Sequence, residues 1–193
     1  IMARVYDHTL LDKLSEHASI PVINGLSDSF HPCQILADFM TIKEKKKTLK
    51  GLKIAWIGDG NNVCNSMIYG AALSGAKMSI ATLKGFEPDK STVKVSQNLT
   101  DIELTTDPLK AAENADVVVT DTYSSIHNND SKRIKKFIPK YQVNDKIMNL
   151  AKKNAIFLHC LPAKRDQEVT SSVIDGPQSV VWDEAENRLH TQK

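Results

Sequence analysis

The sequence has no long hydrophobic run, few cysteines and nearly balanced charges, and each of these absences argues against a class of protein. No apolar run approaches the roughly 20 residues that a membrane-spanning helix needs. The three cysteines among 193 residues form no CxxC pair, which argues against a zinc site or a disulfide framework and for a cytoplasmic protein. A formal net charge of +2 provides no general attraction to nucleic acid or membranes.

Strand-like apolar runs alternate with helix-like segments along the chain. Helices are expected from Asp7 or Thr9, from His31-Pro32, from Asn62 to the cap at Gly75, and from Asp107-Pro108. The apolar runs lie at 3–6, 20–23, 52–57, 77–82, 116–121, 155–159 and 179–182, and Asn24-Gly25 after the second run indicates a turn. This order predicts an α/β fold of three α/β/α layers around a central, mostly parallel, Rossmann-like sheet.

Three polar clusters directly follow predicted strands, at residues 58–62, 121–125 and 159–162. In open parallel sheets, ligands bind beyond the carboxyl ends of the strands. We therefore expect the three clusters to meet at one rim of the sheet and to form the functional site.

The run His159-Cys160-Leu161-Pro162 is the most unusual of these clusters. A cysteine at a strand end can present a thiol, or a thiolate if cations are near. The Leu-Pro step predicts an extended backbone with carbonyl groups directed into the site. Without further context, a small buried cysteine that only packs is the commoner interpretation.

The segment Gly58-Asp59-Gly60-Asn61-Asn62 lies at a strand-to-helix turn and superficially resembles a dinucleotide fingerprint. Asn62 stands near the place of the third glycine, and no clear acidic ribose ligand ends the next strand. Two amides at a helix N-terminus suit a zwitterionic amino acid better, because the helix dipole favours its carboxylate. Asp121, at another strand end, could hold the ammonium group of such a ligand, although an ordinary loop aspartate is equally compatible with the pattern.

Four further residues can donate hydrogen bonds to a small ligand. His31 and Gln34 are three residues apart on one predicted helical face, so both can donate to one small carbonyl. Arg4 and Arg188 offer guanidinium groups that fit oxyanions such as phosphate. Either arginine alone would more commonly form a surface ion pair.

Taken together and in order, these motifs resemble the ornithine carbamoyltransferases of the aspartate/ornithine carbamoyltransferase superfamily. The run from His159 to Arg165 is similar to the family signature, and the run from His31 to Gln34 is similar to its carbamoyl-phosphate motif. The resemblance implies transfer of the carbamoyl group of carbamoyl phosphate to the δ-amine of L-ornithine, which gives L-citrulline and phosphate. It implies small-molecule substrates and no metal or organic cofactor.

The resemblance also implies roles for individual residues. Catalytic roles fall on Cys160, His31 and Arg188. Carbamoyl phosphate would be bound by Arg4, His31, Gln34, Cys160, Leu161 and Arg188. Ornithine would be bound by Asn62, Asp121, Ser125, Ile126 and Cys160.

The resemblance divides the chain into residues 1–30, a remnant of the carbamoyl-phosphate-binding domain, a linking helix at 31–50, and an ornithine-binding domain at 51–193 whose last helix is cut short. The family's phosphate-binding Ser-Thr-Arg-Thr-Arg loop would lie upstream, so the chain by itself is expected to turn over weakly or not at all. The full-length protein is expected to be a homotrimer.

Three other functions remain open at this stage. Ile126 replaces a methionine of the family pattern, so a transcarbamylase for another amine, such as putrescine or acetylornithine, is one alternative. The others are a catalytically silent amino-acid-binding domain and a dinucleotide-dependent oxidoreductase.

Overall fold

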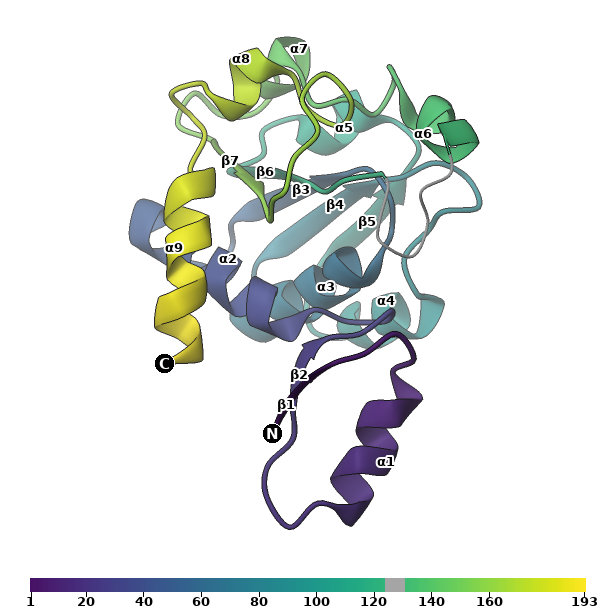
Figure 1. Cartoon of the computed structure of the whole chain (residues 1–193). Coiled ribbons are helices and arrows are strands. Elements are labelled where there is room, and N and C mark those ends of the chain that lie inside the picture. Colours follow the sequence, from purple (N-terminus) through teal and green to yellow (C-terminus); the bar gives the residue numbers. More distant parts are fainter. Residues whose placement is uncertain (124–130) are drawn as a thin grey trace.

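A parallel sheet forms the centre of the computed structural model, which describes residues 1–123 and 131–193 (Figure 1). Within these ranges, its strands have the order β5-β4-β3-β6-β7, and every neighbouring pair is parallel. The strands are β3 (Lys53–Ile57), β4 (Lys77–Ala81), β5 (Ile102–Thr105), β6 (Val117–Thr120) and β7 (Ile156–His159). The predicted α/β class is therefore confirmed. None of the helices in the described ranges has the length and apolar character to cross a membrane.

Helices cover both faces of this sheet (Figure 1). One face carries α2 (Pro32–Lys46), α3 (Asn62–Ser74) and α4 (Lys90–Ser96), and α9 (Val181–Gln192) packs along α2. The opposite face carries α5 (Pro108–Ala112), α6 (Ser131–Phe137), α7 (Asp145–Met148) and α8 (Ser171–Ile174). The three predicted layers are present.

The core follows the two-residue period of the strands. Ile54 and Trp56 of β3 face the cluster formed with α2 and α3, whereas Ala55 and Ile57 face the cluster on the other side of the sheet. All four side chains are fully buried. Strands buried on both faces read as continuous apolar runs, which is why these strands were recognisable from the sequence.

Two predicted helix boundaries are confirmed by their caps. Gly75 ends α3 with φ of 74°, a left-handed conformation that glycine adopts without a steric penalty. The Asp107 side chain accepts a hydrogen bond from the Leu109 N–H at 3.0 Å and caps α5, whose first residue is Pro108.

A small unit precedes the main sheet: β1 (Met2–Arg4), α1 (Thr9–His17) and β2 (Ile23–Leu26), with β1 and β2 parallel. The predicted turn at Asn24-Gly25 is wrong, because both residues lie inside β2. A Cβ on Gly25 would stand 3.1 Å from the Ala3 carbonyl oxygen, so the glycine permits close approach of the two strands.

The predicted strand at 179–182 is also wrong. Ser179 forms only an isolated bridge with Phe157, and α9 begins at Val181. Asp183 and Glu184 fall in the first turn of this helix, where the helix dipole favours acidic side chains. That local preference outweighs the short apolar run.

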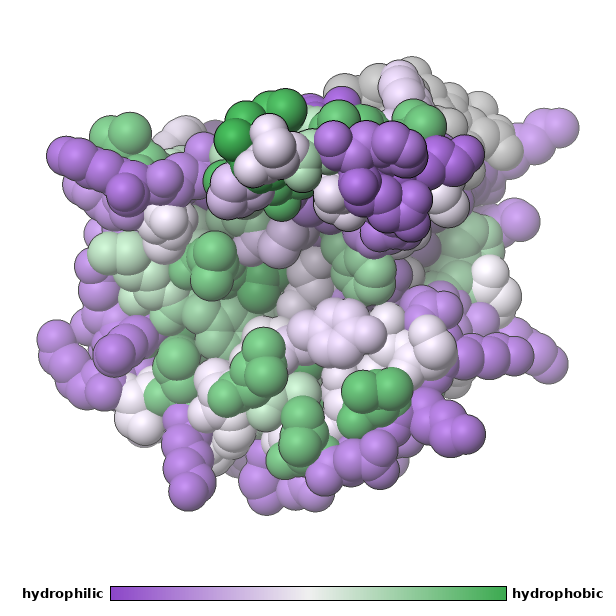
Figure 2. Space-filling model, turned by 90° about the horizontal axis from the view of Figure 1, so that it is seen from below, coloured by the Kyte–Doolittle hydropathy of each residue, from purple (hydrophilic) through white to green (hydrophobic). Residues whose placement is uncertain are grey.

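The lower face of the molecule in Figure 1 is seen directly in Figure 2, where apolar side chains gather toward the middle and hydrophilic ones surround them. Separately, an apolar groove of about 460 Å³ lies between α2 and α3. Its lining includes Leu36 and Leu73, whose side chains are exposed. The groove does not include the strand-end residues that form the candidate site.

Candidate functional site

The three polar clusters meet where the strand order reverses. From β3 the chain moves outward to β4 and β5, then returns to β6 on the other side of β3. The loops that follow β3 and β6 therefore diverge at the carboxyl ends of these strands, and this switch point is where sheets of this kind bind ligands. The loop after β7 lies beside them.

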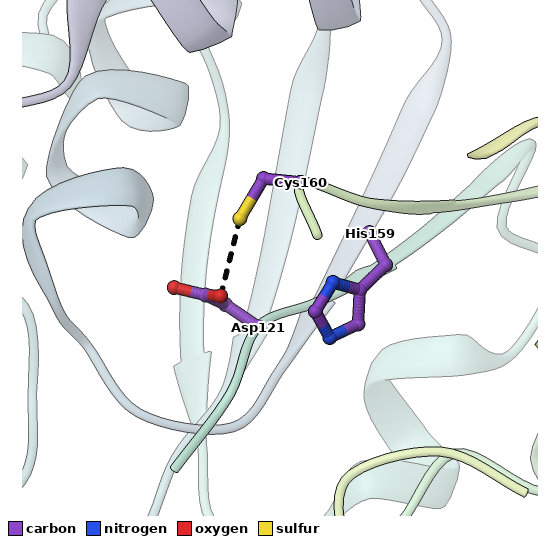
Figure 3. A group of neighbouring side chains, drawn as sticks. All are labelled: Asp121, His159 and Cys160. Carbon is purple, nitrogen blue, oxygen red and sulfur yellow. Dashed lines mark hydrogen bonds between the residues drawn. The ribbon is translucent and has the colours of Figure 1, made fainter. Parts of the chain in front are cut away.

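A hydrogen-bonded chain joins the ends of these three strands. The Cys160 thiol donates to Asp121 Oδ1 at 3.1 Å (Figure 3), and Asn61 Nδ2 donates to Asp121 Oδ2 at 2.6 Å. The structure therefore brings Asp121 and Cys160 together, as the strand-end argument predicted. Asn61 was expected only as one of two amides that suit an amino-acid ligand, and its contact with Asp121 was not predicted, although its place just before a helix is the usual position of a capping amide.

The two amides before and at the start of α3 have different contacts. Asn61 Oδ1 accepts from the N–H groups of Val63 and Cys64, at 3.0 and 3.1 Å, and so caps the helix. Asn62 Nδ2 donates to the Ser27 carbonyl oxygen at 2.7 Å. This bond ties the start of α3 to the segment after β2 and uses one of the two amide hydrogens of Asn62.

The Cys160 side chain is a neutral thiol. Burial raises the pKa of Cys160 well above its ordinary value, and the negative charges of Asp121 and Glu184 raise it further. A protonated thiol is also what the hydrogen bond to Asp121 requires. The site therefore presents a weak donor and not a thiolate nucleophile.

The backbone after Cys160 bends, so the predicted extended conformation of Leu161 is wrong. Leu161 has φ of 54°, and its peptide bond to Pro162 is cis. The Leu161 N–H donates to His159 Nδ1 at 3.0 Å. His159 Nε2 lies 3.1 Å from Glu168 Oε1, which also accepts from the Lys164 N–H at 2.6 Å. These local bonds hold the loop in a turn.

Asp121, His159 and Cys160 are residue types that can bind a transition metal, and their ligand atoms lie within 4.8 Å of one another (Figure 3). However, His159 Nδ1 already accepts from Leu161, so Nε2 carries the ring proton and donates to Glu168. With both ring nitrogens occupied, the three side chains do not form a prepared metal site.

The second half of the site lies at the start of α2. The His31 N–H donates to Ser66 Oγ at 2.8 Å, and the imidazole ring is buried. Burial, together with the positive charges of Arg188 and Arg4, lowers the pKa of His31 to about 4. At neutral pH, His31 is therefore an uncharged imidazole with one donor and one acceptor nitrogen.

Gln34 and Arg188 belong to a buried network between α2 and α9. Arg188 Nη1 donates to Gln34 Oε1 at 2.5 Å. Gln34 Nε2 donates to Asp38 Oδ1 at 2.8 Å and to Glu184 Oε1 at 3.3 Å. Asp38 and Glu184 were missed at the level of sequence, although an acid four residues after Gln34 on the same helical face was a usable signal.

Two buried nitrogen atoms of this region, His31 Nδ1 and Arg188 Nε, have no hydrogen-bond partner among the described residues. Buried polar atoms in folded proteins are nearly always satisfied, so two such atoms in one predicted site indicate the place of a ligand. Arg4 contributes further positive charge, since it acts electrostatically on His31. The region suits an anion with a carbonyl oxygen.

An ion pair between Arg133 of α6 and Asp59 closes one side of the site. Burial raises the pKa of Asp59, and the adjacent Arg133 guanidinium opposes this shift. The guanidinium also lies 4.9 Å from the centre of the Phe86 ring. Nothing in the sequence pattern had singled out Arg133. Ser125 and Ile126, predicted to bind the amino-acid substrate, lie outside the described residues.

The strand order, the switch point and the side chains gathered there define a small-molecule-binding domain of the doubly wound α/β class. The family can be stated more narrowly. The carbamoyl-P binding domain profile of the aspartate/ornithine carbamoyltransferases matches residues 1–44, and their Asp/Orn binding domain profile matches residues 50–193. The chain therefore belongs to the aspartate/ornithine carbamoyltransferase family, as the motifs predicted.

Individual relatives agree with this family. The chain is 61% identical over 193 residues to the ornithine carbamoyltransferase of Cenarchaeum symbiosum, in a match that covers all of this chain and 64% of that protein. It is 51% identical to the ornithine carbamoyltransferase of Methanocaldococcus jannaschii and spans 66% of that protein. The chain thus spans about two thirds or slightly less of the length of these relatives.

Solved structures show the same fold. The ornithine carbamoyltransferase of Pyrococcus furiosus superposes with a TM-score of 0.95 at 50% identity, over all of this chain and 63% of that one. The ornithine carbamoyltransferase of Gloeobacter violaceus superposes with a TM-score of 0.92 at 40% identity, over 99% of this chain and 66% of that one.

Proposed function

We propose that the protein that carries this chain transfers the carbamoyl group of carbamoyl phosphate to the δ-amine of L-ornithine, giving L-citrulline and phosphate. The observation that carries the proposal is the pair of unsatisfied buried nitrogens, His31 Nδ1 and Arg188 Nε, beside a second arginine. The family of the chain and the names of its relatives support the same reaction.

Carbamoyl phosphate would lie at the start of α2. His31 is neutral at pH 7, so it can donate one hydrogen bond to the carbamoyl oxygen without bringing a charge of its own. Arg4 and Arg188 would neutralise the phosphate oxygens, because planar guanidinium groups match oxyanions in shape and charge. Gln34, and the backbone of Cys160 and Leu161, would contact the carbamoyl group.

Ornithine would occupy the carboxyl ends of β3, β6 and β7. Asn62, Asp121, Ser125 and Ile126 would hold its amino-acid end, and Cys160 would lie near the δ-amine. As a neutral thiol, Cys160 positions the amine and does not attack the substrate itself. Its hydrogen bond to Asp121 couples the two sides of this subsite.

In the reaction, the δ-nitrogen forms a bond to the carbamoyl carbon, and the bond from that carbon to the phosphate oxygen breaks. The attacking amine must be uncharged, and it releases one more proton as the new amide forms. Negative charge grows on the carbamoyl oxygen before phosphate leaves, and fixed donors at that oxygen lower the barrier. Holding both substrates in contact can contribute roughly 7 to 11 kcal/mol of the barrier reduction in favourable cases.

The same proposal includes the organisation of the protein. Residues 1–30 would belong to the carbamoyl-phosphate-binding domain, residues 31–50 to a linking helix and residues 51–193 to the ornithine-binding domain. The complete protein would assemble as a homotrimer.

Binding and turnover test the proposal separately. In titration calorimetry on the complete protein, we expect carbamoyl phosphate to bind and L-norvaline, an analogue of ornithine without the δ-amine, to bind after it. Putrescine, acetylornithine and NAD serve as comparison ligands. In a colorimetric assay on the complete protein, ornithine should give citrulline.

Variants of two histidines connect the assays to the site. His31→Ala should lower citrulline formation by about 100-fold, the usual effect of losing one donor to a developing oxyanion. His17→Ala, on the exposed side of α1, should leave the rate unchanged. Citrulline formation that is insensitive to His31, or binding of NAD without binding of norvaline, would overturn the proposal.

A further inference from the structure

Two acidic side chains, Asp38 of α2 and Glu184 of α9, converge on one donor inside the domain: Gln34 Nε2 lies 2.8 Å from Asp38 Oδ1 and 3.3 Å from Glu184 Oε1. Each acid is only 1% exposed. Two buried carboxylates this close together repel each other and have lost their hydration, so one carboxyl group keeps its proton. The pair therefore holds at least one buried proton.

This pair links the two halves of the site. Asp38 Oδ1 accepts from Gln34 Nε2 at 2.8 Å. Glu184 Oε2 accepts from the His159 N–H at 2.9 Å, directly before Cys160 in the chain. One hydrogen-bonded unit thus contacts both a predicted carbamoyl-phosphate residue and the loop that carries the thiol.

The surroundings of the pair favour retention of the proton. Within the described ranges, neither carboxyl group forms an ion pair at 4.0 Å or less. Burial raises the pKa of both acids, and Asp38 raises that of Glu184 further, whereas the hydrogen bond from Gln34 and the charge of Arg188 oppose the shift at Asp38. Glu184 and Asp38 also raise the pKa of the Cys160 thiol electrostatically.

We propose that Asp38 and Glu184 share a buried proton and act as a positioning pair, which sets the orientation of the Gln34 amide and the His159-Cys160 backbone. The proposal rests on the proposed carbamoyl transfer, since it assigns both contacts to that reaction. Neither acid touches the substrates. The pair acts through Gln34 and through the loop after β7.

Amide substitutions can separate a shared proton from two independent acids. Asp38 Oδ1 and Glu184 Oε2 accept the shorter bonds, at 2.8 and 2.9 Å, so an amide at either position keeps its oxygen there. Glu184→Gln gives up only the longer 3.3 Å bond from Gln34 Nε2, which still donates to Asp38. Its NH₂ group then replaces the other oxygen and can donate to the remaining carboxylate. In Asp38→Asn or Glu184→Gln, one N–H therefore takes the place of the shared proton. In the double variant, two NH₂ groups oppose each other with no acceptor between them.

The first measurement does not depend on turnover. The rate at which iodoacetamide alkylates Cys160 in the 193-residue chain, followed by peptide mass spectrometry, reports how firmly the loop after β7 is held. We expect each single amide variant to stay within about twofold of the unsubstituted chain. The double variant and Glu184→Ala should react about tenfold faster, the effect of losing one buried hydrogen bond.

The second measurement is the KM for each substrate with the complete protein. The single amide variants should retain both KM values, whereas the double variant should raise the KM for carbamoyl phosphate about tenfold and that for ornithine less. Glu186→Gln, on the same helix with a side chain that is 75% exposed, is the matched control and should change nothing. Circular dichroism melting confirms that each variant is folded.

The outcomes are distinct. The shared proton is supported if the single amide variants are tolerated and the double variant changes the alkylation rate and KM by more than the two single variants combined. Only interacting sites depart from additivity in this way. The shared proton is refuted if the single amide variants change the alkylation rate as much as Glu184→Ala does. It is also refuted if the double variant leaves the alkylation rate and KM unchanged. If the complete protein forms no citrulline, the proposed function fails, while the alkylation rates still test the pair.

Discussion

The Cys160 thiol donates a hydrogen bond to Asp121 across 3.1 Å, and this bond joins the ends of β6 and β7. It also places the Asp121 carboxylate beside a thiol that is itself partly buried. Burial and the neighbouring carboxylate both raise the pKa of Cys160, because both favour the protonated thiol.

The first prediction concerns the reactivity of this thiol. Asp121→Asn removes the neighbouring charge and should lower the pKa of Cys160 toward its ordinary value. Alkylation at pH 8 should then be severalfold faster than in the unsubstituted chain, since the thiolate is the reactive form. Asp101→Asn, at an exposed acid paired with Lys77, is the control. An unsubstituted Cys160 that already reacts as fast as a free thiol at pH 7 would contradict the argument.

The second prediction concerns stability against pH. The folded pKa of His31 is about 4, below the value of about 6.5 expected in the unfolded chain, so folding favours the neutral ring. The neutral His31 ring makes its full contribution to the free energy of unfolding above about pH 6.5, and this contribution is lost as the pH falls from about 6.5 to about 4. The difference between the unfolded and folded pKa values corresponds to about 3 kcal/mol of unfolding free energy.

Urea unfolding between pH 4 and 7 measures this contribution. His31→Gln cannot take up a proton, so its stability should fall less steeply with acidification than that of the unsubstituted chain. His17→Gln on α1 serves as the exposed control and should retain the original slope. Identical slopes for the His31 variant and the unsubstituted chain would count against a buried neutral imidazole.

The third prediction concerns the turn after β3. A Cβ on Gly60 would lie 2.2 Å from the Pro88 backbone nitrogen and 2.7 Å from the Phe86 carbonyl oxygen. Gly60→Ala should therefore displace the 86–88 backbone and destabilise the domain by about 2 to 4 kcal/mol, in the upper range of single substitutions. At Gly51, which has φ of 79°, a Cβ would meet no described atom within 4 Å.

Gly51→Ala is thus the control for backbone strain alone, with an expected loss of about 1 kcal/mol. Chemical unfolding of the two variants gives the comparison directly. Equal losses would show that the approach of the 86–88 backbone to Gly60 does not matter.

The fourth prediction concerns the loop after β7. Glu168 is fully buried, and its Oε1 atom accepts from the Lys164 N–H and from His159 Nε2. Glu168→Ala should remove both bonds, at about 1 to 3 kcal/mol for each buried donor left without an acceptor. Amide hydrogen exchange should accelerate across residues 159–168.

Glu168→Gln keeps one carbonyl oxygen at this place and should retain most of the protection. Protection factors measured by NMR or mass spectrometry distinguish the two variants. If alanine and glutamine have the same effect, the loop is held by contacts other than this acceptor.

Much of the central sheet could be predicted from the sequence. The apolar runs at β3, β6 and β7 are continuous because those strands are buried on both faces, and the polar residues after them mark the rim. Local preferences also placed the helix ends at Gly75 and Asp107. The motifs at His159-Cys160 and His31-Gln34, taken together with the others, indicated the family to which the chain belongs.

The structural predictions that were wrong have physical causes. Asn24-Gly25 is a turn signal for antiparallel hairpins, but β2 pairs in parallel with β1, which local sequence does not reveal. Leu161 adopts a positive φ because its N–H bonds to the His159 ring, against the local preference of a residue before proline. The run at 179–182 was too short to outweigh a helix start.

The sequence by itself determined the alternation of strands and helices, the rim where the site forms and the residue types gathered there, because burial periodicity and capping are local properties of the chain. Only the tertiary structure decided the state of those residues. The neutral thiol of Cys160, the neutral ring of His31 and the contact of Glu184 with Gln34, 150 residues away, all depend on burial and on long-range hydrogen bonds. Such contacts arise when distant segments pack together, and no local pattern encodes them.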